Sequence, residues 1–139
     1  MANPGSLLRS RSLRKTQVRT SILQLMMENK IAMSERELEK LLNNQCDRVT
    51  IYRTLHTFLE KGLVHKVLDG QGSTKYALCH HDCSAEGEHH HDHVHFRCTH
   101  CEETTCLEHV SIPHVNLPQG YQAAEVNLLF EGLCPKCRQ

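Results

Sequence analysis

Two pairs of cysteines constrain this chain more than any other feature. Cys98 and Cys101 form one CxxC pair, and Cys134 and Cys137 form the other. A two-residue gap lets both sulfurs of a pair face one ion at about 2.3 Å, so two pairs complete a tetrahedral site. Four thiolates leave no position for water, and such sites are structural. The sequence therefore predicts a structural zinc ion held by these four cysteines.

The alternative for these cysteines is redox chemistry. A thioredoxin-like CxxC pair lies in a βαβ unit, and no such pattern surrounds either pair here. The eight cysteines follow no export signal, so we expect reduced thiols in the cytoplasm and no disulfide scaffold. No apolar run approaches about 20 residues, which predicts that the chain does not enter a membrane.

A histidine-rich segment leads into the first cysteine pair. His93 and His95 alternate with Val94 and Phe96 as in a strand, which places both imidazoles on one face. Imidazole and thiolate together suit zinc better than magnesium or manganese. We therefore expect His93 and His95 to be metal ligands. The preceding residues 89–92 are either a solvated polar loop or a weakly metal-binding tract.

The first half of the chain has the pattern of three helices. Apolar residues follow helical spacing from Leu13 to Asn29, with Thr16 as an N-cap. Ser34 and Glu37 form a capping box before a second helix. A third helix is expected from its cap, Asp47, to about residue 61, with Gly62 ending it.

A hairpin is expected after the helices. Residues 63–67 and 75–78 read as short strands, and the Gly-rich residues 69–73 between them read as a turn. Three helices followed by a hairpin predict a winged helix-turn-helix.

The charge of the first half and the outer face of its third helix favour binding to double-stranded DNA. Residues 1–79 hold 13 Lys and Arg against 7 Asp and Glu, whereas residues 80–139 hold 3 against 9. A helix face with Arg and Tyr can read base edges, and basic residues before a helix can hold phosphates. The alternative is a three-helix domain that binds a protein or nothing. The predicted DNA contacts are Arg14, Lys15, Arg19, Thr50, Tyr52, Arg53 and Thr57.

Together these motifs resemble the ferric-uptake-regulator family of metal-sensing regulators over nearly the whole chain. The matching segments are Leu13-Arg-Lys-Thr-Gln-Val-Arg19, Val49-Thr-Ile-Tyr-Arg-Thr-Leu55, Gly62-Leu-Val-His65, His93-x-His95-x-x-Cys98-x-x-Cys101 and Cys134-x-x-Cys137. The resemblance implies an α+β fold, with an N-terminal winged helix-turn-helix (residues 1–80) and a small C-terminal α/β zinc-containing dimerisation domain (residues 81–139). It also implies a transcription factor that binds a pseudo-palindromic operator as a homodimer.

Within the family, the chain looks most like the zinc-uptake-regulator branch. Iron and peroxide sensors place a His just before the second helix, where this chain has residues 31–34 without a ligand. The zinc branch uses a wing His or Asp and a strand-end Cys, which correspond here to His65 and Cys79. Joined to His93 and His95, these residues imply a regulatory zinc site. Without the resemblance, His65 would read as an ordinary strand residue and Cys79 as a small buried hydrophobe.

The chain departs from the family pattern at several positions. The acidic ligand five residues after the second cysteine is replaced by Cys106, with Glu108 nearby. These two residues and His91 could form an additional metal site. The family's long helix is hard to place in residues 110–120, where two prolines and a glycine favour a loop or short strands.

The resemblance thus implies a metal-dependent transcriptional repressor, responsive to zinc. One alternative is an iron-, manganese- or peroxide-responsive regulator of the same family. Another, from a different class, is a zinc-binding adaptor or storage protein. A catalytic zinc would need an open water position beside a general base. No motif supplies that arrangement, so neither an enzyme activity nor a small-molecule substrate is expected.

Overall fold

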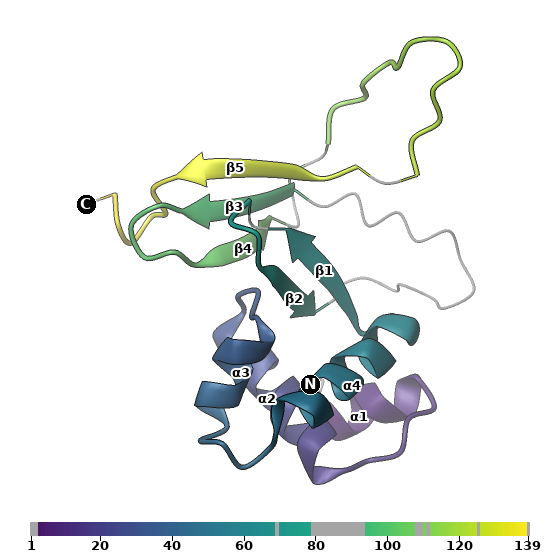
Figure 1. The fold of residues 1–139 in the computed structure, drawn as a ribbon, viewed down its shortest axis with the longest axis vertical. Helices are drawn as coiled ribbons and strands as arrows, with labels where there is room; N and C mark the ends of the chain where they lie inside the picture. The colour runs from purple at the N-terminus through teal and green to yellow at the C-terminus, as the bar shows by residue number, and fades with distance from the viewer. Residues whose placement is uncertain are drawn as a thin grey trace.

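The computed structural model describes residues 3–68, 70–78, 94–107, 110, 112–124 and 126–138. Within these residues, helices precede strands along the chain (Figure 1). The elements are α1 (Pro4–Ser10), α2 (Gln17–Asn29), α3 (Glu35–Leu41), α4 (Arg48–Glu60), β1 (Val64–Leu68), β2 (Thr74–Leu78), β3 (Val94–Cys98), β4 (Thr104–Leu107) and β5 (Leu128–Gly132). The predicted α+β class is confirmed.

Side-chain caps set where the predicted helices begin. The hydroxyl of Thr16 accepts the amide of the third residue of α2, and Asp47 does the same for α4. Ser34 and Glu37 form a reciprocal capping box at α3. These bonds satisfy amide groups that a helix start otherwise leaves without a partner. All three predicted caps are confirmed, and α2 begins at Gln17, directly after its cap.

The helices and the hairpin share one apolar core. The buried face of α4 contains Ile51, Leu55 and Phe58, as its helical spacing predicts. Thr54 is buried beside them, and its hydroxyl is satisfied because it donates to the Thr50 carbonyl at 2.8 Å. The buried core cluster is Leu8, Ile22, Leu23, Met26, Met33, Leu38, Ile51, Leu55, Phe58, Leu63, Val64 and Tyr76. Burial of these side chains is the main stabilising contribution to this part of the molecule. We call α1–α4 together with β1 and β2 the helical half, and the part that contains β3–β5 the other half.

Two small sheets follow the helices. Strands β1 and β2 pair antiparallel as the wing, and their turn contains Gly70 and Gly72 at positive φ. The second sheet has the order β4-β3-β5, with β3 antiparallel to β4 and parallel to β5. In Figure 1 the wing lies between the helices and this second sheet.

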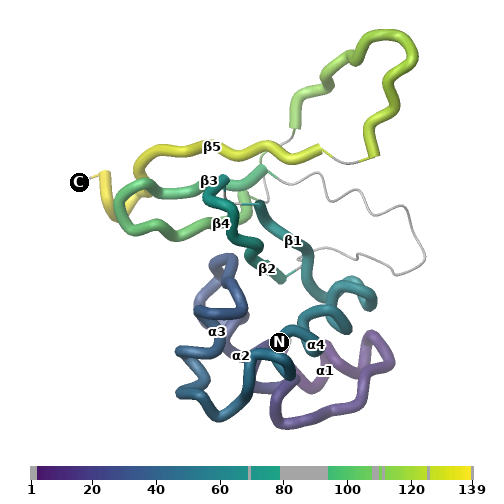
Figure 2. The backbone as a smooth tube through the Cα atoms, in the orientation of Figure 1, coloured from purple at the N-terminus to yellow at the C-terminus, as the bar shows by residue number. Residues whose placement is uncertain are grey.

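The segment between α2 and α3 contacts both sheets (Figure 2). Met33 exchanges two backbone hydrogen bonds with Tyr76 of β2, and the Ala32 amide donates to the Thr104 carbonyl of β4 at 2.8 Å. The Met33–Tyr76 bonds hold this segment on the wing, and the Ala32–Thr104 bond joins it to the second sheet.

The described residues between β4 and β5 form no helix. Residues 110, 112–124 and 126–127 are irregular or turns, as the two prolines and the glycine predict. In the described part of the chain, no helix is long and apolar enough to cross a membrane. The domain boundary at residues 80 and 81 stays a prediction, because residues 79–93 lie outside the described ranges.

Candidate metal centres and nucleic-acid interface

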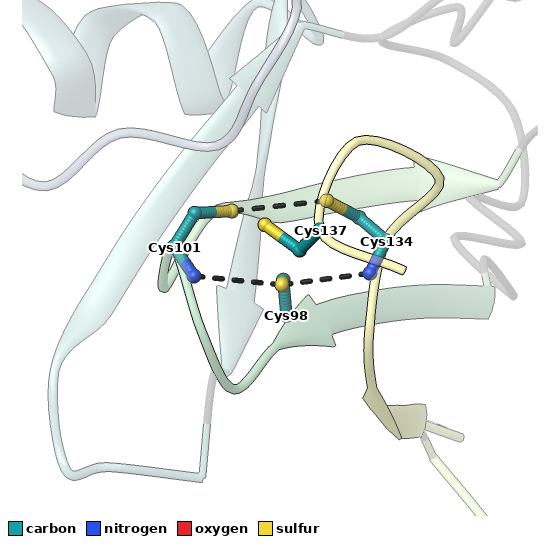
Figure 3. A group of neighbouring side chains, drawn as sticks. All are labelled: Cys98, Cys101, Cys134 and Cys137. Atoms are coloured by element: carbon teal, nitrogen blue, oxygen red, sulfur yellow. Dashed lines mark hydrogen bonds between the residues drawn. The ribbon is translucent and has the colours of Figure 1, made fainter. Parts of the chain in front are cut away.

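The four paired cysteines meet at one end of the second sheet (Figure 3). Cys98 ends β3 and Cys101 lies in the following turn, while Cys134 and Cys137 follow β5. Parallel pairing of β3 with β5 brings the two pairs together, because Cys98 lies opposite Gly132. We call these four residues the four-cysteine cluster. Their sulfur atoms all lie within 4.8 Å of one another.

The geometry of the four-cysteine cluster fits a tetrahedral zinc ion. The sulfurs of Cys101 and Cys134 are 3.9 Å apart, and zinc–sulfur bonds of about 2.3 Å place tetrahedral sulfurs about 3.8 Å apart. The sulfur of Cys98 accepts the backbone amides of Cys101 and Cys134, each at 3.5 Å. Amide donation to a ligand sulfur stabilises its thiolate form. The donor set is therefore prepared for a divalent cation.

The thiol pKa values differ within the four-cysteine cluster. The backbone amides of Cys101 and Cys134 lower the pKa of Cys98 to about 6. Hydrogen bonding with Cys134, followed by burial, raises the pKa of Cys137 to about 12. The amide donors thus favour the thiolate of Cys98, while the hydrogen bond and burial favour the protonated thiol of Cys137. A bound divalent cation would favour the thiolate form of all four cysteines.

A second group of metal-binding side chains lies where the wing meets the second sheet. It contains His65 of β1, His95 of β3 and Cys106 of β4, whose ligand atoms lie within 4.8 Å of one another. His95 and Cys106 are partners in the β3–β4 register. His65 and His95 are 3% and 4% exposed, so both imidazoles are removed from bulk water. We call these residues the three-ligand cluster.

The distances in the three-ligand cluster also fit zinc. The Nε2 atoms of His65 and His95 are 3.4 Å apart, and zinc–nitrogen bonds of about 2.0–2.1 Å place tetrahedral nitrogens about 3.3 Å apart. Two imidazoles and one thiol form a donor set that suits zinc. The sequence pattern places Cys106 in a separate predicted site, and the β3–β4 register is the signal that joins it to His95.

The remaining predicted ligands lie outside the described residues. Cys79 and His93 of the predicted regulatory site are among them, as are His91 and Glu108 of the predicted additional site. Of the predicted regulatory ligands, the structure brings His65 and His95 together.

The predicted DNA contacts lie on α4 and at the start of α2. On α4, Thr50, Tyr52 and Arg53 are exposed, while Thr57 is half-buried and its hydroxyl donates to the Arg53 carbonyl at 3.0 Å. The predicted basic contacts near the start of α2 also differ in exposure. Arg14 and Lys15 are exposed, and Arg19 is half-buried with its guanidinium donating to the Arg14 carbonyl at 2.7 Å.

Solved structures of several metal regulators share this fold. A zinc uptake regulator complexed with zinc and DNA is 25% identical, with a TM-score of 0.66 over 96% of this chain and 89% of that chain. The Vibrio cholerae ferric uptake regulator is 20% identical, with a TM-score of 0.62 over 94% and 98%. A zinc-bound manganese uptake regulator is 17% identical, with a TM-score of 0.62 over 96% and 99%. The last two show similarity of fold alone.

Sequence comparison gives the family. No curated protein matches this sequence. The family model described as the ferric uptake regulator family matches residues 10–125, which is most of the chain. This protein therefore belongs to the ferric uptake regulator family of metal-responsive regulators.

Proposed function

We propose that this protein is a zinc-responsive transcriptional repressor that binds operator DNA as a homodimer. The observation that carries the proposal is the three-ligand cluster, because its ligands come from both sides of the contact between the wing and the second sheet. His65 belongs to the wing, whereas His95 and Cys106 belong to the second sheet. A metal held by all three residues would connect the DNA-binding half to the other half.

Zinc is the proposed metal because of the thiol at position 106. Iron and manganese regulators would use nitrogen and carboxylate ligands there, whereas thiolate with imidazole suits zinc. Cys79 and His93 remain the predicted further ligands of this regulatory site. The four-cysteine cluster would hold a second, structural zinc, since four thiolates leave no open position. The 25% identical neighbour, a zinc uptake regulator solved with zinc and DNA, supports this choice.

The regulatory step would be a shift between two arrangements of the halves. Zinc bound at the three-ligand cluster would supply bonds to the wing and to the second sheet at once. With His65 held beside His95 and Cys106, α4 has a defined orientation to the second sheet. Two such subunits could then present their α4 helices to successive half-sites on one operator face. A tenfold rise in operator affinity needs only about 1.4 kcal/mol of coupling.

The second sheet offers a surface for the partner subunit. Among the described residues, strand β5 is an edge strand of its sheet. Phe130 on β5 and Leu133 just after it are 49% and 52% exposed. Exposed apolar side chains beside an open strand edge favour contact with another chain. A second copy would cover them in the proposed homodimer.

The test measures how tightly the protein binds a labelled DNA fragment of the gene's own promoter. Fluorescence anisotropy at fixed salt gives the affinity. The protein is titrated in three conditions: with buffered free zinc, with ferrous iron in the absence of oxygen, and with a chelator that removes the regulatory metal. We expect tight binding with zinc alone. Binding driven by iron would contradict the choice of metal. Binding to neither this promoter nor other candidate promoters would favour a zinc adaptor or storage protein.

A further inference from the structure

The contact between the halves contains a buried lysine that belongs to neither metal cluster. Lys75 lies on β2, paired with Val67 of β1, and only 7% of its surface is exposed. Its ammonium lies 3.5 Å from a carboxylate oxygen of Glu37 and 3.5 Å from the carbonyl oxygen of Glu102. Burial of a charged amine is unfavourable unless it is paired and hydrogen-bonded. A charged Lys75 is therefore stable at this buried position because both the Glu37 carboxylate and the Glu102 carbonyl lie beside it.

The two neighbours of Lys75 come from opposite halves of the molecule. Glu37 lies in the first turn of α3, where its other carboxylate oxygen accepts the Ser34 amide. Glu102 directly follows Cys101 and has a φ of 65°. Its amide donates to the Cys98 carbonyl at 2.9 Å. The turn of the four-cysteine cluster thus directs the Glu102 carbonyl toward Lys75.

We propose that Lys75 is a positioning residue that stabilises the closed arrangement of the two halves before the regulatory metal binds. Its ammonium joins the wing, the helix-turn-helix and the turn of the four-cysteine cluster. The Ala32–Thr104 backbone hydrogen bond lies at the same boundary. The same arrangement brings His65 to His95, so Lys75 also prepares the regulatory site. This inference rests on the proposed zinc-dependent binding of DNA.

A positioning role has a different signature from a phosphate contact. If metal-free protein is mostly open, weakening the closed state raises the free zinc needed for half-maximal DNA binding. With zinc saturating, nearly all molecules are closed and operator affinity changes little. Loss of a phosphate contact would instead lower operator affinity at every zinc concentration. The zinc midpoint and the zinc-saturated affinity therefore separate the two roles.

The first test compares Lys75→Met with wild type and with Lys66→Met. Methionine keeps most of the apolar stem and removes the charge, and Lys66 is an exposed wing lysine that controls for that loss. Lys75→Met should raise the zinc midpoint about threefold to tenfold and leave the zinc-saturated operator affinity within about twofold. Lys66→Met should not raise the midpoint. An unchanged midpoint for Lys75→Met, or an equal loss of affinity at all zinc levels, would overturn the proposal.

A second test needs no DNA. Amide hydrogen exchange of the zinc-loaded protein follows the Ala32 amide, which donates across the boundary, and the Leu55 amide, which lies in the core of α4. Lys75→Met should speed exchange at Ala32 about threefold to tenfold and leave Leu55 unchanged. Equal rates at Ala32 in both proteins would overturn the proposal, whereas a failed promoter assay for wild type would count against the proposed function instead.

Glu37→Gln provides a second variant if Lys75→Met does not fold. Glutamine at this position can still accept the Ser34 amide, so the capping box of α3 is kept while the negative charge is removed. We expect a smaller shift of the zinc midpoint in the same direction, because the Glu37 side chain is 44% exposed and its ion pair is screened by water. A midpoint equal to that of wild type would contradict the proposal.

Discussion

The Nε2 atoms of His65 and His95 lie 3.4 Å apart, although 30 positions separate the two residues in the chain. His65 lies on the wing and His95 on the second sheet, so their approach depends on how the two halves are arranged. Cys106 is the cross-strand partner of His95 and completes the three-ligand cluster. Metal binding at this cluster therefore depends on how the two halves are arranged.

Replacing Cys106 by Asp should change the metal preference of this cluster. Aspartate keeps a negatively charged ligand and removes the sulfur, so zinc affinity should fall about 10- to 100-fold while manganese is bound relatively better. The measurement uses cobalt(II) added after the four-cysteine cluster has been filled with zinc. The thiolate-to-cobalt charge-transfer band of the wild-type site should be weaker in Cys106→Asp, where Cys79 is the one proposed thiolate ligand left. A band of equal intensity in both proteins would exclude Cys106 as a ligand.

Replacing Cys134 by Ser should remove the structural metal. One of the four thiolates is lost, and we expect zinc affinity at that cluster to fall by more than about 100-fold, since even outer-shell changes cost about 10- to 100-fold. Native mass spectrometry should then find one zinc fewer per chain, with a lower unfolding temperature. Cys46→Ser is the control, because Cys46 lies outside both clusters and should leave the zinc content unchanged. Full zinc content in Cys134→Ser would contradict a four-cysteine site.

Replacing Arg53 by Ala should weaken operator binding without changing the zinc content. The exposed guanidinium on α4 can contact a guanine edge or a phosphate, and its loss should cost about 1–3 kcal/mol of binding free energy. Arg138→Ala, an exposed arginine after the last cysteine, removes the same charge from the other half and serves as the control. Equal operator affinities for Arg53→Ala and Arg138→Ala would remove Arg53 from the interface.

Acid should weaken the cap of α4 through Asp47. Hydrogen bonds from Thr50 lower the pKa of Asp47 below its ordinary value of 3.8. A lowered pKa contributes stability above the unfolded value, and that contribution is lost as the pH falls through the folded value. In zinc-free protein, the difference in free energy of unfolding between wild type and Asp47→Asn should shrink below about pH 4, because Asn caps without titrating. Urea unfolding at several pH values measures this difference. A difference that does not change with pH would contradict the role of the ionised Asp47 as the cap of α4.

The helical half could be predicted from sequence because its signals are local. The caps at Thr16, Ser34 and Asp47 each lie within three residues of the amide that they satisfy. Helical spacing likewise indicates the buried face of α4. Helix α1 is not indicated by apolar periodicity, since its seven residues are too few for a clear repeat. Its signal is the capping box of Asn3 and Ser6 with Pro4 at the first position.

The second half was harder to predict because its contacts join distant residues. The two cysteine pairs could be expected to meet, since their spacing alone specifies a metal site. Strand β5 pairs with β3 in parallel across more than 30 positions, and no short-range pattern marks that partner. The place of Cys106 beside His95 depends on the β3–β4 register. The buried charge of Lys75 depends on two further segments, so a strand pattern reads it as a surface residue.

The most direct test of the account is the zinc dependence of operator binding by His95→Ala, with wild type and His100→Ala beside it. His100 is an exposed histidine in the turn between Cys98 and Cys101, and its loss should be neutral. Wild type and His100→Ala should gain at least about tenfold in operator affinity as buffered free zinc rises. His95→Ala should keep the zinc of the four-cysteine cluster and bind the operator weakly at every zinc level. A full zinc-dependent gain by His95→Ala would contradict regulation through the three-ligand cluster.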